Sequence, residues 1–144
     1  MHKNKPIRVA VVGYKRFITI NGEDGIIKWL PEALEGYFNF HFCYKDIVEE
    51  RDQSKSIEAL VKEMLNTNPD VLHYCNYRDT YNIKKIDEEY IKTTRKFSRV
   101  PVLLTSTHPD AQKIAKKYNA HYLPTPIRIN SYYKCIKKLV EKNI

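Results

Sequence analysis

Residue types that could perform nucleophilic chemistry are few in this chain of 144 residues. Cys75 closes an apolar run that begins at Val71, and a thiol at the end of a strand becomes reactive when a cation such as Lys15 stabilises its thiolate. A cysteine in such a run commonly fills a small apolar space, and we favour that interpretation. His73, in the same run, and His121 are expected to be packing or edge residues of the sheet rather than a catalytic pair.

Metal, nucleotide and membrane-spanning motifs are absent from the sequence. Cys43, Cys75 and Cys135 are far apart with no CxxC pair, which suits reduced thiols in a cytoplasmic protein. No glycine-rich loop of the GxGxxG or P-loop kind is present, so nucleotide binding has little support. No apolar run approaches the roughly 20 residues of a membrane span. We therefore expect a cytoplasmic protein with no metal, no cofactor and no membrane contact.

The elements that must position these residues are short apolar runs alternating with amphipathic segments. The runs are rich in β-branched or aromatic residues, and several lack polar alternation, which predicts strands covered on both faces. Pro31 indicates that the first helical segment begins near Leu30. The expected strands are Ile7–Gly13, Phe38–Tyr44, Val71–Cys75, Val100–Thr105 and His121–Leu123, and the expected helices cover residues 25–37, 54–65, 83–97, 109–118 and 130–140.

Strands that alternate with helices of this length predict right-handed crossovers and a parallel sheet. The chain has no linker and no internal repeat, so residues 1–144 are expected to form one doubly wound α/β domain with five strands. A ligand crevice is expected beyond the carboxyl ends of the strands, where the strand order reverses.

Three motifs in the second half occur in an order typical of one family. A Pro-Asp turn opens the strand at Pro69–Cys75, a Pro-Val strand follows at Pro101–Ser106, and a Tyr-Leu strand ends in a proline within Asn119–Ile127. In this order and spacing the chain resembles the receiver domains of two-component response regulators. The resemblance implies the flavodoxin-like strand order 2-1-3-4-5 and a role in signalling.

The residues for receiver phosphorylation are replaced. Transfer of a phosphoryl group to an aspartate needs a carboxylate nucleophile, an acidic pair for Mg²⁺, and a cation with a hydroxyl group. The resemblance places Gly13 and Tyr14 at the acidic pair, Cys75 at the nucleophile and Thr125 at the lysine. The hydroxyl position alone keeps its type, as Ser106 or Thr105. We therefore predict a pseudo-receiver that is not phosphorylated and is not an enzyme.

Two cations follow the first predicted strand. Lys15 and Arg16 are expected at the mouth of the crevice, where they would repel Mg²⁺ and favour an anion. This predicts anion binding at Lys15 and Arg16.

The net charge of +8 is concentrated near the two ends of the chain. From His108 onward, eight Lys or Arg side chains stand against Asp110 and Glu141. In receivers the fourth helix, fifth strand and fifth helix commonly bind partners or form homodimers, so the resemblance implies such a surface here. An acidic protein partner is favoured over nucleic acid, with Tyr118, Tyr132 and Tyr133 as apolar anchors. The predicted partner-binding residues are Lys113, Lys116, Lys117, Tyr122, Tyr133, Lys134, Lys137 and Lys138.

Two other functions remain open at the level of sequence. The strands at Pro69–Tyr74 and Val100–His108 also resemble the N-terminal Rossmann domain of glycosyltransferases, although the chain is too short for the nucleotide-sugar domain. The charge distribution alone is compatible with a nucleic-acid-binding α/β domain. The simplest alternative explanation of the basic charge is that the lysine-rich helix faces contact only solvent.

Overall fold

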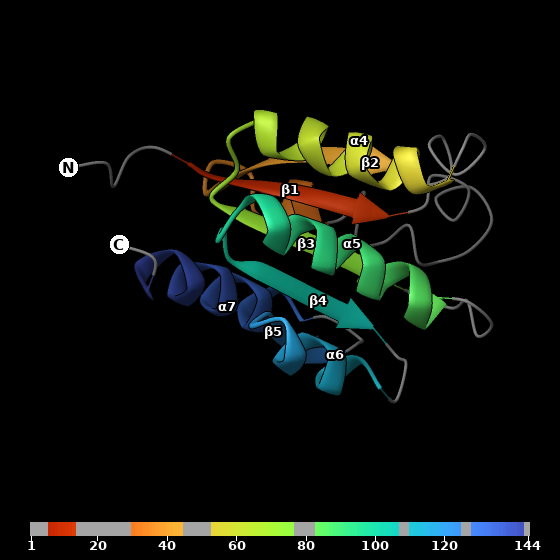
Figure 1. Cartoon of the computed structure of the whole chain (residues 1–144). Coiled ribbons are helices and arrows are strands. Elements are labelled where there is room, and N and C mark those ends of the chain that lie inside the picture. The colour runs from red at the N-terminus through yellow and green to blue at the C-terminus, as the bar shows by residue number, and fades with distance from the viewer. Residues whose placement is uncertain are drawn as a thin grey trace, which may run out of the picture.

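The computed structural model describes residues 6–13, 30–44, 53–76, 83–106, 110–124 and 128–142. Its strands are β1 (Ile7–Gly13), β2 (Phe38–Tyr44), β3 (Val71–Asn76), β4 (Val102–Ser106) and β5 (His121–Pro124) (Figure 1). Its helices are α4 (Gln53–Asn66), α5 (Ile83–Phe97), α6 (Ala111–Lys117) and α7 (Ile129–Lys142). Residues 30–33 add a single helical turn before β2.

The strands form one parallel sheet in the order β2-β1-β3-β4-β5. The predicted α/β class and the order 2-1-3-4-5 are therefore confirmed. This order differs from the 3-2-1-4-5-6 order of Rossmann domains, which argues against the glycosyltransferase alternative. Because all strands are parallel, Gly13, Asn76, Ser106 and Pro124 end at the same edge of the sheet.

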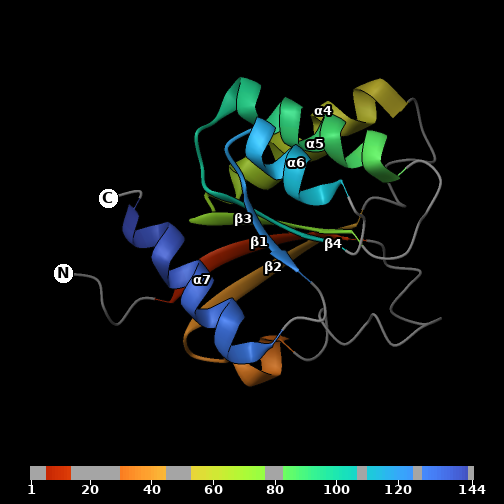
Figure 2. The ribbon, with the colours of Figure 1, turned by 90° about the horizontal axis from the view of Figure 1, so that it is seen from below.

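Helices cover both faces of the sheet (Figure 2). One face packs against α4, α5 and α6, and its core includes Val12, Leu72, Tyr74 and Leu104. The opposite face packs against α7 and the turn at residues 30–33. Its core includes Val9, Val11, Leu30, Cys75, Leu103 and Ile136. Successive strand residues thus alternate between two buried cores, which explains why the sequence shows continuous apolar runs.

The observed boundaries differ from the predicted ones by small amounts. The fourth strand begins at Val102 rather than Val100, because Pro101 has no N–H for the ladder, although its carbonyl accepts a hydrogen bond from the Leu72 N–H at 2.9 Å. The first helical segment is confirmed only as the turn at residues 30–33, and the part before Leu30 lies outside the described residues. Gly36 ends that segment with φ of 87°, a value that glycine adopts without strain.

Candidate functional site

The carboxyl edge of the sheet is where the resemblance placed the phosphorylation pocket. Gly13 ends β1, Cys75 is the penultimate residue of β3, and Ser106 ends β4. In the sheet register Cys75 lies beside Thr105, and Asn76 lies beside Ser106. The other four predicted pocket and anion-binding residues, Tyr14, Lys15, Arg16 and Thr125, lie outside the described residues.

Cys75 faces the protein interior. Its side chain is 1% exposed and belongs to the core between the sheet and α7. Its Sγ lies 3.3 Å from Nε2 of His73, two residues earlier on the same strand. A thiol this well buried is poorly accessible to a phosphoryl donor. The arrangement fits the packing role that the sequence favoured.

His73 is the centre of a buried hydrogen-bond network. Its Nε2 lies 2.8 Å from Oγ1 of Thr105, and its Nδ1 lies 2.9 Å from the hydroxyl of Tyr132 on α7. A neutral imidazole has one donor and one acceptor, and the two hydroxyl groups satisfy both of them in either tautomer. His73, Thr105 and Tyr132 are each fully buried. The network therefore ties β3, β4 and α7 together below the edge at which Cys75 stands.

Burial sets the charge state of this network. Desolvation lowers the pKa of His73 from 6.5 to about 3, so the ring is neutral at physiological pH. Desolvation likewise raises the pKa of Tyr132 well above 10, and that phenol also stays neutral. A neutral, fully paired network stabilises the fold but offers neither a general base nor a cation for phosphoryl chemistry.

Metal coordination has no candidate in the part of the chain that the structure describes. No group of three or more His, Cys, Asp or Glu side chains is positioned there to hold an ion. Desolvation raises the pKa of Cys43 to about 12 and that of Cys135 to about 11, so both thiols are protonated. None of the helices within these residues is long and apolar enough to cross a membrane.

The two helices of the predicted basic surface pack on opposite faces of the sheet and flank its edge strand, as the sequence predicted. Helix α6 packs on one face and α7 on the other, with the edge strand β5 between them (Figure 2). Lys113, Lys116 and Lys117 on α6 are exposed, but Lys117 turns toward α5. Its Nζ lies 2.9 Å from Oε2 of Glu88, away from β5.

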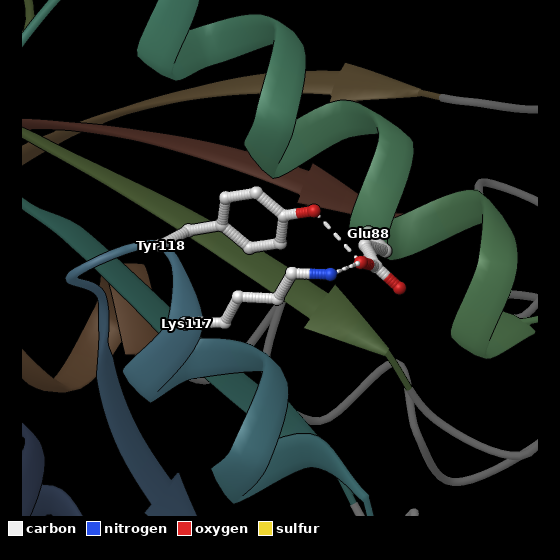
Figure 3. A network of polar contacts seen from close by, with 3 residues as sticks. All are labelled: Glu88, Lys117 and Tyr118. Atoms are coloured by element: carbon white, nitrogen blue, oxygen red, sulfur yellow. Dashed lines mark hydrogen bonds and ion pairs between the residues drawn. The ribbon is translucent and has the colours of Figure 1, made fainter.

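Glu88 joins α5 to the end of α6 through two contacts (Figure 3). Besides the ion pair with Lys117, its Oε2 accepts a hydrogen bond of 2.7 Å from the hydroxyl of Tyr118. The hydrogen bond of Lys117 with the Glu88 carboxylate, followed by its hydrogen bond with Tyr118, raises the pKa of Lys117. Lys117 and Tyr118 are therefore structural contacts between α5 and α6, which sequence spacing alone did not reveal.

Arg95 fixes the turn that leads from α6 into β5. Its guanidinium donates hydrogen bonds to the carbonyls of Tyr118 at 2.8 Å, Asn119 at 3.0 Å and Val100 at 2.7 Å. Asn119 has φ of 56°, so the chain reverses sharply at this point. Together with Glu88, Arg95 holds α6 and the start of β5 on α5. The sequence showed Arg95 only as one of many charged helix residues.

The lysines of α7 spread over a broad arc of the helix. Residues three or four apart share a side, whereas neighbours are turned by about 100°. Lys134, Lys138 and Lys142 therefore form one exposed stripe, and Lys137 lies on the flank of Tyr133. Within the described residues none of these four lysines has an ion-pair partner.

The stripe lies next to the start of β5. The pKa of His121 is lowered, first by partial burial and then by the positive charges of Lys142 and Lys138. Both lysines thus act on the imidazole electrostatically. We call His121, Lys134, Lys138 and Lys142 the β5–α7 ridge. Lys142 closes the segment predicted for the partner surface but was not among the individually predicted residues, and His121 lies exposed on the edge strand β5, in agreement with the predicted packing or edge position.

The predicted aromatic anchors are mostly used inside the protein. Tyr132 is fully buried, so its prediction as a partner contact is wrong. The ring of Tyr133 stacks on Phe38 of β2, with 5.7 Å between centroids, and meets Tyr37 edge-on. Because β2 is the edge strand opposite β5, Tyr133 lies away from the ridge. Tyr122 is half-buried against the core under α4, α5 and α6.

Comparisons with known proteins agree with this fold. No family model matches the chain, and no curated protein matches its sequence. Its fold is similar to three solved structures. For the receiver domain of Francisella response regulator 1452, the TM-score is 0.64 and the identity 16%, over 96% of this chain and 99% of that one. For a signal receiver domain of a two-component histidine kinase from Clostridium thermocellum, the TM-score is 0.61 and the identity 13%, over 93% of this chain and 97% of that one.

The third structure is a CheY-like response regulator from Mesorhizobium loti. Its TM-score is 0.56 and its identity 12%, over 94% of this chain and 99% of that one. The matches span nearly the whole length of both proteins, and the resemblance noted in the sequence is confirmed at the level of the fold. The chain has the fold of response-regulator receiver domains.

Proposed function

We propose that this protein is a pseudo-receiver, a non-enzymatic signalling module that binds a protein partner through β5 and α7 without being phosphorylated. The observation that carries the proposal is the exposed stripe of Lys134, Lys138 and Lys142 in the β5–α7 ridge, three cations with no ion-pair partners among the described residues. Unpaired charges aligned on one helix are poorly placed to stabilise the fold and well placed to attract a partner of opposite charge.

Two features of the carboxyl edge support the absence of phosphorylation. The nucleophile position holds Cys75, whose buried thiol replaces the carboxylate of a receiver. Directly beneath it lies the neutral network of His73, Thr105 and Tyr132, which supplies no charge to a phosphoryl group. Signalling through this fold must then depend on a partner's differential affinity rather than on a covalent trigger.

The attachment of α6 to α5 supports a surface that is presented at all times. Glu88 and Arg95 hold Lys117, Tyr118 and Asn119 through side-chain and backbone contacts. Because the start of β5 follows directly from this turn, the ridge is preorganised for binding. We place the protein in the cytoplasm, in agreement with its free cysteines.

Charge reversal on the ridge tests this function. Lys134→Glu with Lys138→Glu should abolish recovery of the partner when the tagged protein is used as bait in lysate from its own cells. The matched control is Lys92→Glu with Lys96→Glu, which reverses two exposed lysines at the same spacing on α5, across the sheet. A mobility-shift assay with duplex DNA runs in parallel. Equal recovery with both variants, or loss of sequence-selective DNA binding in place of a protein partner, would overturn the proposal.

A further inference from the structure

The edge strand β2 lacks the sequence features that usually keep a strand edge from pairing with another chain. Within the described residues it pairs on one side only, with β1, and all seven residues of the strand stay in register without a bulge. The strand, FNFHFCY, contains no Lys, Arg, Asp, Glu or Pro. Natural proteins protect an exposed edge with short strands, charges, prolines or bulges. The outer side of β2 is therefore a row of backbone donors and acceptors about 23 Å long that is open to pairing.

The opposite edge of the sheet has such protection. The strand β5 has four residues and ends in Pro124. Leu123 packs into the core that α7 covers, and α7 carries the exposed stripe of Lys134, Lys138 and Lys142. A second copy that met the protein at this edge about a two-fold axis would oppose these cations to its own. Self-association is therefore disfavoured at β5 and unopposed at β2.

Aromatic side chains extend the open edge of β2 on the face that α7 covers. Phe40 and Phe42 are half-buried, and their rings stack with 6.0 Å between centroids. Tyr37, directly before the strand, is 58% exposed and meets the half-buried ring of Tyr133 edge-on at 5.6 Å. Aromatic residues are enriched in the surfaces through which proteins associate. Backbone pairing at β2 would thus be accompanied by burial of apolar area.

The local charge at β2 suits a second copy of this chain. The charged side chains described around the strand are of both signs: Glu32 and Glu35 before it, Arg8 and Asp70 beside β1, and Lys137 on the flank of α7 that carries Tyr133. In a chain of net charge +8, two copies repel each other less where the local charge is balanced. An acidic protein or a nucleic acid finds no group of cations at this edge among the described residues, in contrast to the ridge.

We propose that β2 pairs antiparallel with β2 of a second copy, so that the two sheets join into one continuous sheet. This inference goes beyond the proposed function and does not depend on the ridge. Antiparallel pairing about a two-fold axis is self-complementary, because each copy offers the same strand. With the axis at His41, the middle residue of β2, all seven residues are paired. Phe40 of each copy then faces Phe42 of the other, which forms cross-strand aromatic pairs on one face of the sheet.

Oxidative cross-linking of His41→Cys tests the pairing directly. The axis places residue 41 of each copy opposite its equivalent, and opposite residues in an antiparallel pair have Cα atoms about 4.5–5.5 Å apart, a separation that a disulfide spans. The whole protein with this substitution should form a covalent dimer under mild oxidation. Wild type, which has the three native cysteines, gives the background, and Gln112→Cys, at an exposed position of α6, should not exceed it.

Analytical ultracentrifugation gives the oligomeric state without a cross-link. We expect wild type to dimerise reversibly, and His41→Lys to weaken the dimer at least several-fold, because the axis brings the two added charges together. Gln112→Lys adds the same charge elsewhere and should dimerise like wild type, and circular dichroism checks that both variants are folded. A wild type that stays monomeric at its highest soluble concentration would overturn the inference. A dimer that both lysine variants weaken equally, or one in which His41→Cys does not cross-link above background, would overturn it as well.

Discussion

The residue that most distinguishes this protein from a phosphorylated receiver is Cys75, together with the histidine beneath it. The sequence placed Cys75 at the nucleophile position and His73 in a packing role, and both side chains are buried. It could not show that His73 contacts Tyr132, because the two are separated by 59 residues and meet only through the crossover to α7. Tyr132 and Tyr133 are adjacent and of the same residue type, so the sequence does not distinguish them. Only the rotation of α7 about its axis decides which of the two side chains is buried.

The buried imidazole makes stability depend on pH. The pKa of His73 is about 3 in the folded protein against an ordinary value of 6.5. Between these values the unfolded chain binds a proton that the folded protein does not, so stability decreases as pH falls. From about pH 6 to pH 4 this site should cost about 1.4 kcal/mol of unfolding free energy per pH unit.

Urea unfolding of His73→Gln measures that contribution. The variant should lose less stability than wild type over this pH range, because glutamine does not titrate. His41→Gln, at an exposed position of β2, is the control and should keep the wild-type slope. Parallel pH profiles for wild type and His73→Gln would show that the ring is protonated in the folded protein.

At the scale of elements, the bounds of the strands were predictable from the sequence. The contacts that each side of a helix makes were not. The strands Ile7–Gly13 and Phe38–Tyr44 have the predicted bounds, because continuous apolar runs belong to strands buried on both faces. The basic surface was predicted as one merged patch from lysine spacing. Lys117 instead pairs with Glu88, which is 29 residues away in the sequence, and turns toward α5. Residue spacing shows which side chains share one side of a helix. It does not show which other element of the fold that side contacts.

The attachment of α6 to α5 depends on Arg95 more than on the ion pair. Arg95→Met removes hydrogen bonds to the carbonyls of Tyr118, Asn119 and Val100 and should lower the unfolding free energy by roughly 2 kcal/mol. Lys96→Met, at the next and exposed position, should change it by less than about 0.5 kcal/mol. Chemical denaturation of both variants measures the difference, and equal effects would mean that the guanidinium contacts do not hold this turn.

At the scale of the whole molecule, the chain has the fold of a receiver, and the proposal is that its phosphorylation chemistry is replaced. Motifs at Pro69–Cys75, Pro101–Ser106 and Asn119–Ile127 allowed the strand order to be predicted, because they lie at strand starts and ends that the fold fixes. The chain spans nearly the full length of the receiver domains that it matches, at identities of 12% to 16% for the three compared. Such divergence preserves the buried alternation of strands and helices and leaves the edge of the sheet free to change.

The most direct test of the account is exposure of the wild-type protein to acetyl phosphate and Mg²⁺, followed by intact-mass analysis. Amide NMR spectra with beryllofluoride and Mg²⁺ provide the second readout, with a phosphorylatable receiver domain as the positive control. The account predicts no phosphoryl adduct and no saturable shifts of the amides around Cys75 or Ser106, because the nucleophile position offers a buried thiol in place of a carboxylate. A stoichiometric phosphoryl adduct, or saturable Mg²⁺-dependent shifts at the carboxyl ends of β3 and β4, would contradict it.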